Sequence, residues 1–403
     1  MLYFLHCNGE YEDVEIDRIC QLPSKSFLLL GPRGTGKSTI IRKTVPFKIE
    51  INLLRSKEFL PLSANPSLLE KRVEHLKQGD WVYIDEIQKI PALLDEVHYL
   101  YEKKKLNFAL SGSSARKLKR GGANLLAGRA IAGQFFPLTF AEYKDYHTIE
   151  DAVDWGVMPQ VVTQSELRSE YLSTYVEAYL KEELMEEGLI RKLEPFVRFL
   201  QTLGIMNAQV LNVENIARES HVGRTTVDKY FEIIEETLLG FRLSPLRAKW
   251  NAKESSHPKF YLFDPGVARA CAGLLSDEVD GVWRGQSFES LIINEVRAHN
   301  HYLKKNRNLF YYSYSGGYEI DLIIENKKKT LSLAQELTAI EIKFSKKWDK
   351  RWNSNLEDFK SKSRGRVKRL IGVYRGFEVI EFPTVVVYPV GDFLNRLSEG
   401  EFF

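Results

Sequence analysis

Residues 31–39 read GPRGTGKST, a complete phosphate-binding loop, and this stretch decides the fold of the N-terminal part of the chain. Its glycines allow backbone N–H groups to converge on phosphates, Lys37 reaches the outer phosphates, and the Ser38 hydroxyl is a ligand for Mg²⁺. The apolar run 26–30 reads as a strand entering the loop, and residues 38–43 read as the helix that leaves it. The sequence therefore predicts an ATP site made by Gly31, Pro32, Arg33, Gly34, Thr35, Gly36, Lys37, Ser38 and Thr39.

A second motif supports this interpretation, because an apolar strand over residues 81–84 ends in Asp85 and Glu86. In this arrangement Asp85 holds Mg²⁺ through water, and Glu86 polarises the attacking water. A carboxylate beside the Mg²⁺ ligand favours hydrolysis over mere nucleotide holding. We therefore expect ATP and Mg²⁺ as cofactors of a hydrolytic site.

Further candidates near the ATP site are a sensor of the γ-phosphate and an arginine finger. Ser111 follows the strand predicted at 106–110, with Ser113 as an equal candidate, and the alternative is a helix N-cap. Arg129 is the candidate for an arginine finger that acts across a subunit interface, which predicts a homo-oligomer. The alternative for Arg129 is a surface salt bridge.

Composition limits the class of protein. With 403 residues the chain has room for two or three domains, and a net charge of +3 means that nucleic-acid affinity must come from local patches. Cys7, Cys20 and Cys271 are far apart, which argues against disulfides and fits a reducing compartment. His299 and His301 are expected at an exposed helix end rather than as metal ligands. Without a secretory signal or a membrane-spanning run, we expect a cytoplasmic protein with no membrane partner.

Residues 212–236 read as a helix-turn-helix, with helices at 216–220 and from 224 onward and a turn at 221–223. Strands at 241–243 and 259–263 are expected to form a wing. Such a winged helix suits DNA, but acids on its second helix, among them Asp228 and Glu232, repel phosphates. Contact with a protein partner or a role in domain positioning is therefore the alternative.

The C-terminal part combines a helix and two strands that carry carboxylates. Glu289 lies in an amphipathic helix at 288–296, Asp321 lies in a strand at 318–325, and Glu341 and Lys343 share one face of a strand at 339–344. Glu295 is the alternative carboxylate on the helix. This order resembles the PD-(D/E)XK nuclease fold, in which carboxylates hold one or two Mg²⁺ ions and the lysine orients water. Because such modules can bind without cutting, nuclease activity stays a separate question.

A basic stretch follows at 346–369, with Trp348 and Trp352 at helical spacing. The pattern is typical of a phosphate-binding patch next to a metal site. The alternatives are a solvated basic face and tryptophans that anchor the core.

Three segments together, GPRGTGKST, WVYIDEIQKIP and SGSSARKLKRGGANLLAGRA, resemble a large prokaryotic family of AAA-like ATPases with a C-terminal domain of unknown function. The resemblance implies an α/β chain with a parallel-sheet ATPase core at 1–150, a helical linker and winged helix at 151–275, and a restriction-endonuclease-like module at 276–403. We therefore expect an ATPase that acts on DNA, with metal-dependent cutting left open. The alternative is an ATP-switched regulator that binds DNA or protein through a non-cleaving module.

Overall fold

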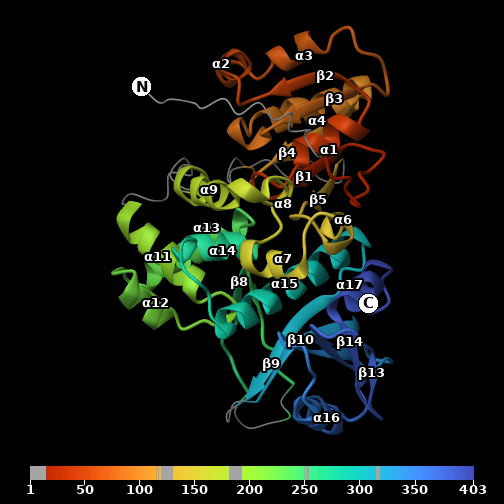
Figure 1. Ribbon diagram of the computed structural model, residues 1–403. Coiled ribbons are helices and arrows are strands. Elements are labelled where there is room, and N and C mark those ends of the chain that lie inside the picture. Colours follow the sequence, from red (N-terminus) through yellow and green to blue (C-terminus); the bar gives the residue numbers. More distant parts are fainter. Residues whose placement is uncertain are drawn as a thin grey trace.

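The computed structural model describes residues 15–114, 116, 118, 130–180, 193–248, 250, 254–314 and 318–403. Figure 1 shows three parts that follow one another along the chain, from the red and orange N-terminal part to the blue C-terminal part. Within the described residues each part contains one sheet, of five, three and six strands respectively. In these ranges every helix is too short or too polar to cross a bilayer.

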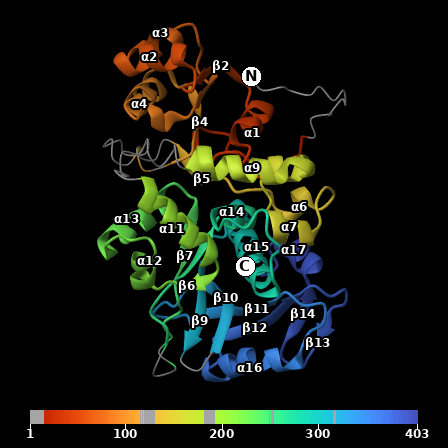
Figure 2. The ribbon, with the colours of Figure 1, turned by 60° about the vertical axis from the view of Figure 1, so that its left-hand side comes forward.

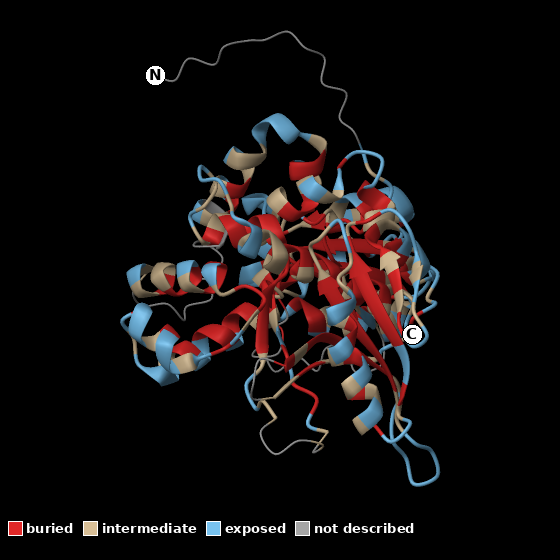
Figure 3. Ribbon diagram, turned by 60° about the horizontal axis from the view of Figure 1, so that its bottom comes forward, coloured by how far each residue is buried: buried red, intermediate tan, exposed pale blue. Residues whose placement is uncertain are grey.

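The N-terminal part is a parallel sheet in the order β2-β3-β4-β1-β5, with helices packed on it. Strands covered on both faces are apolar throughout, and all four residues of β1 are buried. Figure 3 shows buried residues, in red, gathered in the interior of the molecule with exposed residues, in pale blue, around them. The elements are β1 Phe27–Leu30, α1 Lys37–Thr44, β2 Phe47–Asn52, α2 Ser56–Ala64, α3 Leu68–Arg72, β3 Trp81–Asp85, η1 Ile87–Lys89, α4 Leu93–Lys104, β4 Asn107–Gly112, β5 Ile131–Gln134 and α6 Phe140–Tyr143. This sheet confirms the expected parallel-sheet core, and it brings the ends of β1, β3 and β4 to one edge.

The middle part is helical around a small sheet in the order β6-β8-β7. Its helices pack through an aromatic core that includes Phe196, Phe199 and Phe231. The elements are α7 Ile149–Trp155, α8 Pro159–Thr163, η2 Ser165–Leu167, α9 Arg168–Thr174, η3 Tyr175–Leu180, α11 Leu193–Ile205, β6 Gln209–Val210, α12 Val213–Glu219, α13 Arg224–Glu236, β7 Gly240–Leu243, β8 Lys259–Leu262 and α14 Pro265–Cys271. The two helices and two strands that the sequence predicted here are present, although β8 is buried along its whole length.

The C-terminal part is a mixed sheet in the order β13-β14-β12-β11-β10-β9. The long helix α15 begins after Asp280, whose carboxylate accepts a hydrogen bond from the Trp283 N–H as an N-cap. The elements are α15 Gly281–Tyr302, β9 Asn308–Tyr314, β10 Tyr318–Lys327, β11 Glu336–Lys343, η4 Lys350–Trp352, α16 Asn353–Lys362, β12 Val367–Tyr374, β13 Ile380–Glu381, β14 Val386–Pro389 and α17 Val390–Ser398. The predicted order of helix, strand and strand is therefore present.

One hydrophobic core joins the second and third sheets and reaches the first part. It contains Tyr143, Ala152 and Tyr261 together with Phe288 and Ile340, so residues far apart in the sequence pack as one body. Figures 1 and 2 show α15 running through the middle of the molecule, between α7 and the C-terminal sheet. Because this core crosses residue 275, the domain limits at 150 and 275 stay predictions.

Candidate functional site

The phosphate-binding loop lies between β1 and α1, where the sequence placed it. Gly34 and Gly36 adopt φ values of 78° and 92°, a left-handed backbone that glycine tolerates best. A Cβ on Gly31 would lie 2.3 Å from the Phe135 carbonyl oxygen, so this glycine permits close packing against the end of β5. The loop thus has the tight backbone that phosphate binding requires.

Lys37 folds back over this loop. Its ammonium donates to the carbonyl oxygens of Gly31 and Pro32, at 2.7 and 2.8 Å. These neutral acceptors keep the buried charge hydrogen-bonded while leaving it beside the loop. A phosphate oxygen entering the loop can take over these hydrogen bonds, since charge-assisted bonds are the stronger ones.

The predicted Mg²⁺ ligands lie side by side. The Ser38 hydroxyl is 3.1 Å from both carboxylate oxygens of Asp85, which is buried at the end of β3. Ser111 donates to the same carboxylate at 2.5 Å and lies 3.0 Å from the Tyr83 hydroxyl. Hydroxyl and carboxylate oxygens suit Mg²⁺, so the donor set fits this ion. Ser111 is placed to align Asp85, and its role as a phosphate sensor stays a prediction.

Glu86 adopts a left-handed backbone with φ of 60°, an uncommon conformation for a residue with a side chain. Its carboxylate accepts a hydrogen bond from the Gln88 amide, which also donates to Ser113 at 2.9 Å. Backbone strain of this kind is found at functional sites, where surrounding contacts hold it in place. Gln88 thus joins Glu86 to Ser113, a connection that sequence reasoning missed. The predicted arginine finger, Arg129, lies outside the described residues.

Arg18 is a second residue that the sequence analysis missed. Its guanidinium donates to the carbonyl oxygens of Thr35 at 2.5 Å and Phe136 at 2.8 Å, and to the Glu142 carboxylate at 2.9 Å. It therefore ties the phosphate-binding loop to the segment after β5. Next to it a cavity of about 160 Å³ opens between the loop and α8, lined by Arg18, Gly36, Thr39, Pro159, Gln160 and Thr163 among others. The cavity provides room for a group attached to a phosphate chain in the loop.

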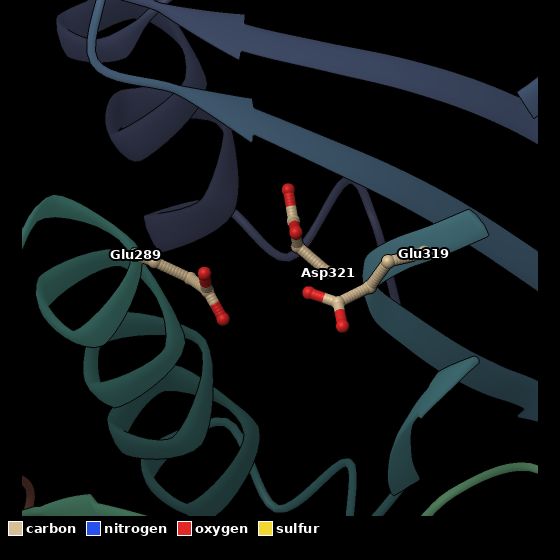
Figure 4. A group of neighbouring side chains, drawn as sticks. All are labelled: Glu289, Glu319 and Asp321. Atoms are coloured by element: carbon tan, nitrogen blue, oxygen red, sulfur yellow. The ribbon is translucent and has the colours of Figure 1, made fainter. Parts of the chain in front are cut away.

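The C-terminal carboxylates come together from three elements, α15, β10 and β11. Figure 4 shows Glu289 reaching from α15 toward Asp321 and Glu319 on β10, and ligand oxygens of these three residues lie within 4.8 Å of one another. Glu341 joins them through Lys343, whose ammonium lies 2.6 Å from Glu341 and 3.4 Å from Asp321. The structure thus brings together the predicted residues Glu289, Asp321, Glu341 and Lys343. We call the four acids at this place, Glu289, Glu319, Asp321 and Glu341, the carboxylate cluster.

A bulge directs Asp321 into this cluster. Along the pairing of β10 with β9, Ile320 faces Tyr312 but Ile323 faces Phe310, so the register shifts at residues 321–322. Bulges re-aim side chains and are common beside active sites. On the other side of β10 the Ile342 N–H donates to the Asp321 carboxylate at 2.7 Å, which fixes its orientation.

Three members of the site were not predicted: Glu319, Lys259 and Tyr261. The Lys259 ammonium lies 2.8 Å from Glu289 and 2.5 Å from Glu319, and the Tyr261 hydroxyl donates to Glu289 at 2.6 Å. Glu319 precedes Asp321 by two residues, so strand alternation was a signal for it. Lys259 and Tyr261 come from β8 of the middle part, and no local pattern connects them to the cluster.

Burial governs the ionisation of these groups. It raises the pKa of Glu289 to about 7 and of Glu341 to about 8, with the neighbouring Asp321 charge adding to both shifts and the lysines opposing them. Burial lowers the pKa of Lys259, but the surrounding carboxylates outweigh this effect and hold it well above its ordinary value. Carboxylate oxygens in this number suit a divalent metal, so the donor set fits Mg²⁺.

Glu295, the alternative helix carboxylate, points elsewhere. It accepts a hydrogen bond from the Phe140 N–H at 2.6 Å and lies 3.4 Å from His299. The expectation of an exposed helix end at His299 and His301 was wrong, because α15 ends against the N-terminal part. There His301 accepts a hydrogen bond from the Gln134 N–H at 2.8 Å.

The helix-turn-helix and the basic stretch are only partly free for a ligand. Asp228 and Glu232 are exposed on α13, whereas Glu236 pairs with Arg116 of the N-terminal part. In the basic stretch, Trp348 stands edge-on to Trp352 and packs against the C-terminal sheet, which favours the alternative of core anchors. The lysines around them are exposed: Lys346, Lys347, Lys350 and Lys368.

Comparison with known protein families finds three matching domains, of which one belongs to a family with an informative description. Residues 23–144 match the family described as an AAA domain, while residues 146–278 and 284–393 match two domains of unknown function, DUF8612 and DUF4143. An uncharacterized protein of Methanocaldococcus jannaschii is 24% identical over 358 residues, covering 79% of this chain and 76% of that protein. An uncharacterized protein of Mycobacterium tuberculosis is 24% identical over 311 residues, covering 74% and 67%.

Among solved structures, the Aeropyrum pernix ORC1 protein in complex with DNA has a TM-score of 0.27 and 15% identity, covering 62% of this chain and 86% of that chain. Protein VC1899 of Vibrio cholerae has a TM-score of 0.22 and 11% identity, covering 94% and 97%. The match over residues 23–144 confirms the prediction of an AAA-like ATPase domain. The winged helix and the nuclease-like module stay predictions.

Proposed function

We propose that this protein binds and hydrolyses ATP with Mg²⁺ and couples hydrolysis to action on DNA. The observation that carries the proposal is the juxtaposition of Lys37, Ser38 and Asp85 at the edge of a parallel sheet, within the segment that matches an AAA domain. Among the described residues Cys20 and Cys271 are free thiols, which suits a protein of the reducing cytoplasm. Burial raises their pKa values to about 11 and 12.

In this proposal each residue of the ATP site has a separate role. The loop N–H groups and Lys37 bind the phosphates, and Ser38 and Asp85 hold Mg²⁺, which neutralises phosphate charge when bound. Glu86 orients the attacking water, and Gln88 holds Glu86 in place. Arg129 from a neighbouring subunit is proposed to complete the site, so the protein acts as a homo-oligomer.

Glu86→Gln tests this assignment most directly. The substitution keeps the shape and the hydrogen-bonding ability of the side chain but removes the base. We expect ATP hydrolysis to fall by about 10²–10⁴-fold while ATP binding is retained, as measured by phosphate release and by equilibrium binding of a fluorescent ATP analogue. Gln88→Ala is the comparison for positioning, with a smaller loss. Unchanged hydrolysis in Glu86→Gln would assign water activation to another residue.

The carboxylate cluster supports metal-dependent cutting of DNA. In this proposal Glu289, Asp321 and Glu341 hold Mg²⁺, which stabilises charge on a phosphodiester when bound, and Lys343 orients the water. The test is cleavage of linear, single-stranded and branched DNA with Mg²⁺ or Mn²⁺, with and without ATP. Cutting that disappears in Asp321→Asn and persists in Asp358→Asn, a variant of a half-buried acid on α16 that pairs with Lys362, would establish the nuclease.

A second function is favoured by one observation, the ion pairs that Lys259 makes inside the cluster. If the cluster does not cut, the protein is an ATP-switched regulator that binds DNA or a protein partner through its winged helix and basic stretch. DNA binding without cleavage in every cleavage reaction, with ATP-dependent affinity, would select this function.

A further inference from the structure

The carboxylate cluster already contains a cation that comes from another part of the chain. Lys259 lies on β8 of the middle part, whereas the cluster belongs to α15, β10 and β11 of the C-terminal part. Its side chain is 3% exposed, and its ammonium contacts Glu289 at 2.8 Å and Glu319 at 2.5 Å. A buried ammonium at this position neutralises two carboxylates that would otherwise repel each other.

The position of this ammonium matters because of what surrounds it. Glu289 and Glu319 belong to the group of three acids whose ligand oxygens lie within 4.8 Å of one another, the spacing that would surround a metal ion. Lys259 therefore binds two of the three acids that a divalent cation would need. The Tyr261 hydroxyl of β8 donates to the same Glu289 carboxylate, and the Tyr311 ring of β9 lies 5.7 Å from the ammonium.

A second observation indicates that the cluster is built for a further ligand. One carboxylate oxygen of Glu341 is buried and finds no hydrogen-bond partner in the described part of the chain, although the residue is only 4% exposed. A buried carboxylate oxygen without a donor is costly, which suggests that a ligand satisfies it in the working protein.

We propose that Lys259 is a tethered cation at the metal position of the carboxylate cluster, and that a divalent cation entering between Glu289 and Glu319 must displace it. This inference rests on the proposed metal-binding role of the cluster. It makes metal occupancy depend on how β8 of the middle part sits against the C-terminal part. Withdrawal of Lys259 exchanges one positive charge for a doubly charged ion, so the cluster stays compensated in both states.

The test is a Mn²⁺ titration of the full chain, with free Mn²⁺ measured by electron paramagnetic resonance. We expect Lys259→Met to bind Mn²⁺ at least about tenfold more tightly than the original chain, since one competing charge has been removed from the site. Lys343→Met is the matched control, because it removes the same charge from the same cluster but not from the Glu289–Glu319 position. An equal gain in both variants, or no gain in Lys259→Met, would overturn the inference.

A measurement on the unaltered chain covers the case in which Lys259→Met does not fold. Amine labelling read by mass spectrometry should leave Lys259 unmodified without metal and modify it at Mn²⁺ concentrations that saturate the site. If Mn²⁺ binds and Lys259 remains unmodified, the tethered-cation inference fails while the metal site stands. If neither the original chain nor Lys259→Met binds Mn²⁺, and Asp321→Asn changes nothing, the proposed metal site fails as well.

Discussion

The phosphate-binding loop and the carboxylate cluster both hold a buried lysine, but they hold it in opposite ways. Lys37 donates to the neutral carbonyl oxygens of Gly31 and Pro32, whereas Lys259 donates to the anionic carboxylates of Glu289 and Glu319. A phosphate that enters the loop replaces weak acceptors with strong ones. A divalent cation that enters the cluster has to break charge-assisted contacts first. The phosphate-binding loop can therefore bind its ligand by exchanging the hydrogen bonds from Lys37 to carbonyl oxygens, whereas the carboxylate cluster must first lose the contacts with Lys259.

Of the predictions that compare these two regions, the largest effect is expected in the phosphate-binding loop. Lys37→Met should reduce ATP hydrolysis by about 10²–10³-fold, because it removes the charge placed to stabilise the transferring phosphate. Phosphate release under saturating ATP measures this loss. Mn²⁺ binding by the carboxylate cluster should remain unchanged in the same variant. If Mn²⁺ binding also fell, the two regions would be coupled more tightly than their separate contacts indicate.

The same contrast explains how much could be predicted from the sequence. The loop consists of nine consecutive residues, so its glycines, Lys37 and Ser38 could be assigned from spacing alone. The carboxylate cluster and the lysines that contact it span residues 259 to 343, and only the part on α15, β10 and β11 has a readable pattern. Lys259 enters through the packing of β8 against the C-terminal sheet, a long-range contact that no periodicity reveals.

Arg18 illustrates the same limit within the ATP site. Nothing in residues 15–22 predicts that this side chain reaches Thr35 and Phe136, since those contacts depend on how the N-terminal segment crosses the sheet. Likewise, the half-buried position of His301 follows from the packing of α15 against β5. Element types could be read from the sequence, whereas contacts between elements could not.

The next effect in size compares a buried and an exposed arginine of the ATPase part. Arg18→Ala should lower the free energy of unfolding by about 3–5 kcal/mol, because the buried Glu142 carboxylate then loses its one cationic partner among the described residues. Arg42→Ala, which breaks an exposed pair with Glu50, should cost about 0–1 kcal/mol. Urea unfolding of both variants measures the difference. Equal losses would mean that Arg18 does not hold the loop.

A smaller effect concerns pH and the junction between α15 and β5. Burial lowers the pKa of His301, with the Arg297 charge adding to the shift. The folded chain therefore favours the neutral ring, which accepts a hydrogen bond from the Gln134 N–H. Its contribution to stability is therefore present above about pH 6.5, the ordinary histidine value, and is lost as pH falls through the lowered pKa.

His301→Gln keeps a hydrogen-bond acceptor but cannot titrate. We expect the difference in Tm between the original chain and this variant to change below pH 6.5 and to stay constant above it, by thermal unfolding across a pH series. If the difference in Tm stays constant over the whole pH series, the protonation of His301 does not affect the stability of the folded chain.

The smallest effect concerns the basic stretch. Lys347→Ala should weaken DNA binding equally across sequences and reduce the slope of log affinity against log salt by about 1, as expected for one phosphate contact. Lys48→Ala, an exposed lysine on β2 of the ATPase part, is the control and should leave the slope unchanged. Fluorescence anisotropy at several salt concentrations separates them. The same slope in both variants would remove the basic stretch from the DNA interface.

Helix α15 connects the phosphate-binding loop mechanically to the carboxylate cluster. Near its C-terminal end the Tyr302 hydroxyl accepts from the Phe136 N–H, next to the residue whose backbone packs on Gly31 of the loop. Glu289 lies thirteen residues earlier on the same helix, roughly 20 Å away at the rise of an α-helix. Pivoting such a lever by about 3° at Tyr302 shifts Glu289 by about 1 Å. Metal and catalytic geometry tolerates only about 0.5 Å, so a movement too small to alter the ATPase sheet is large enough to dismantle the cluster.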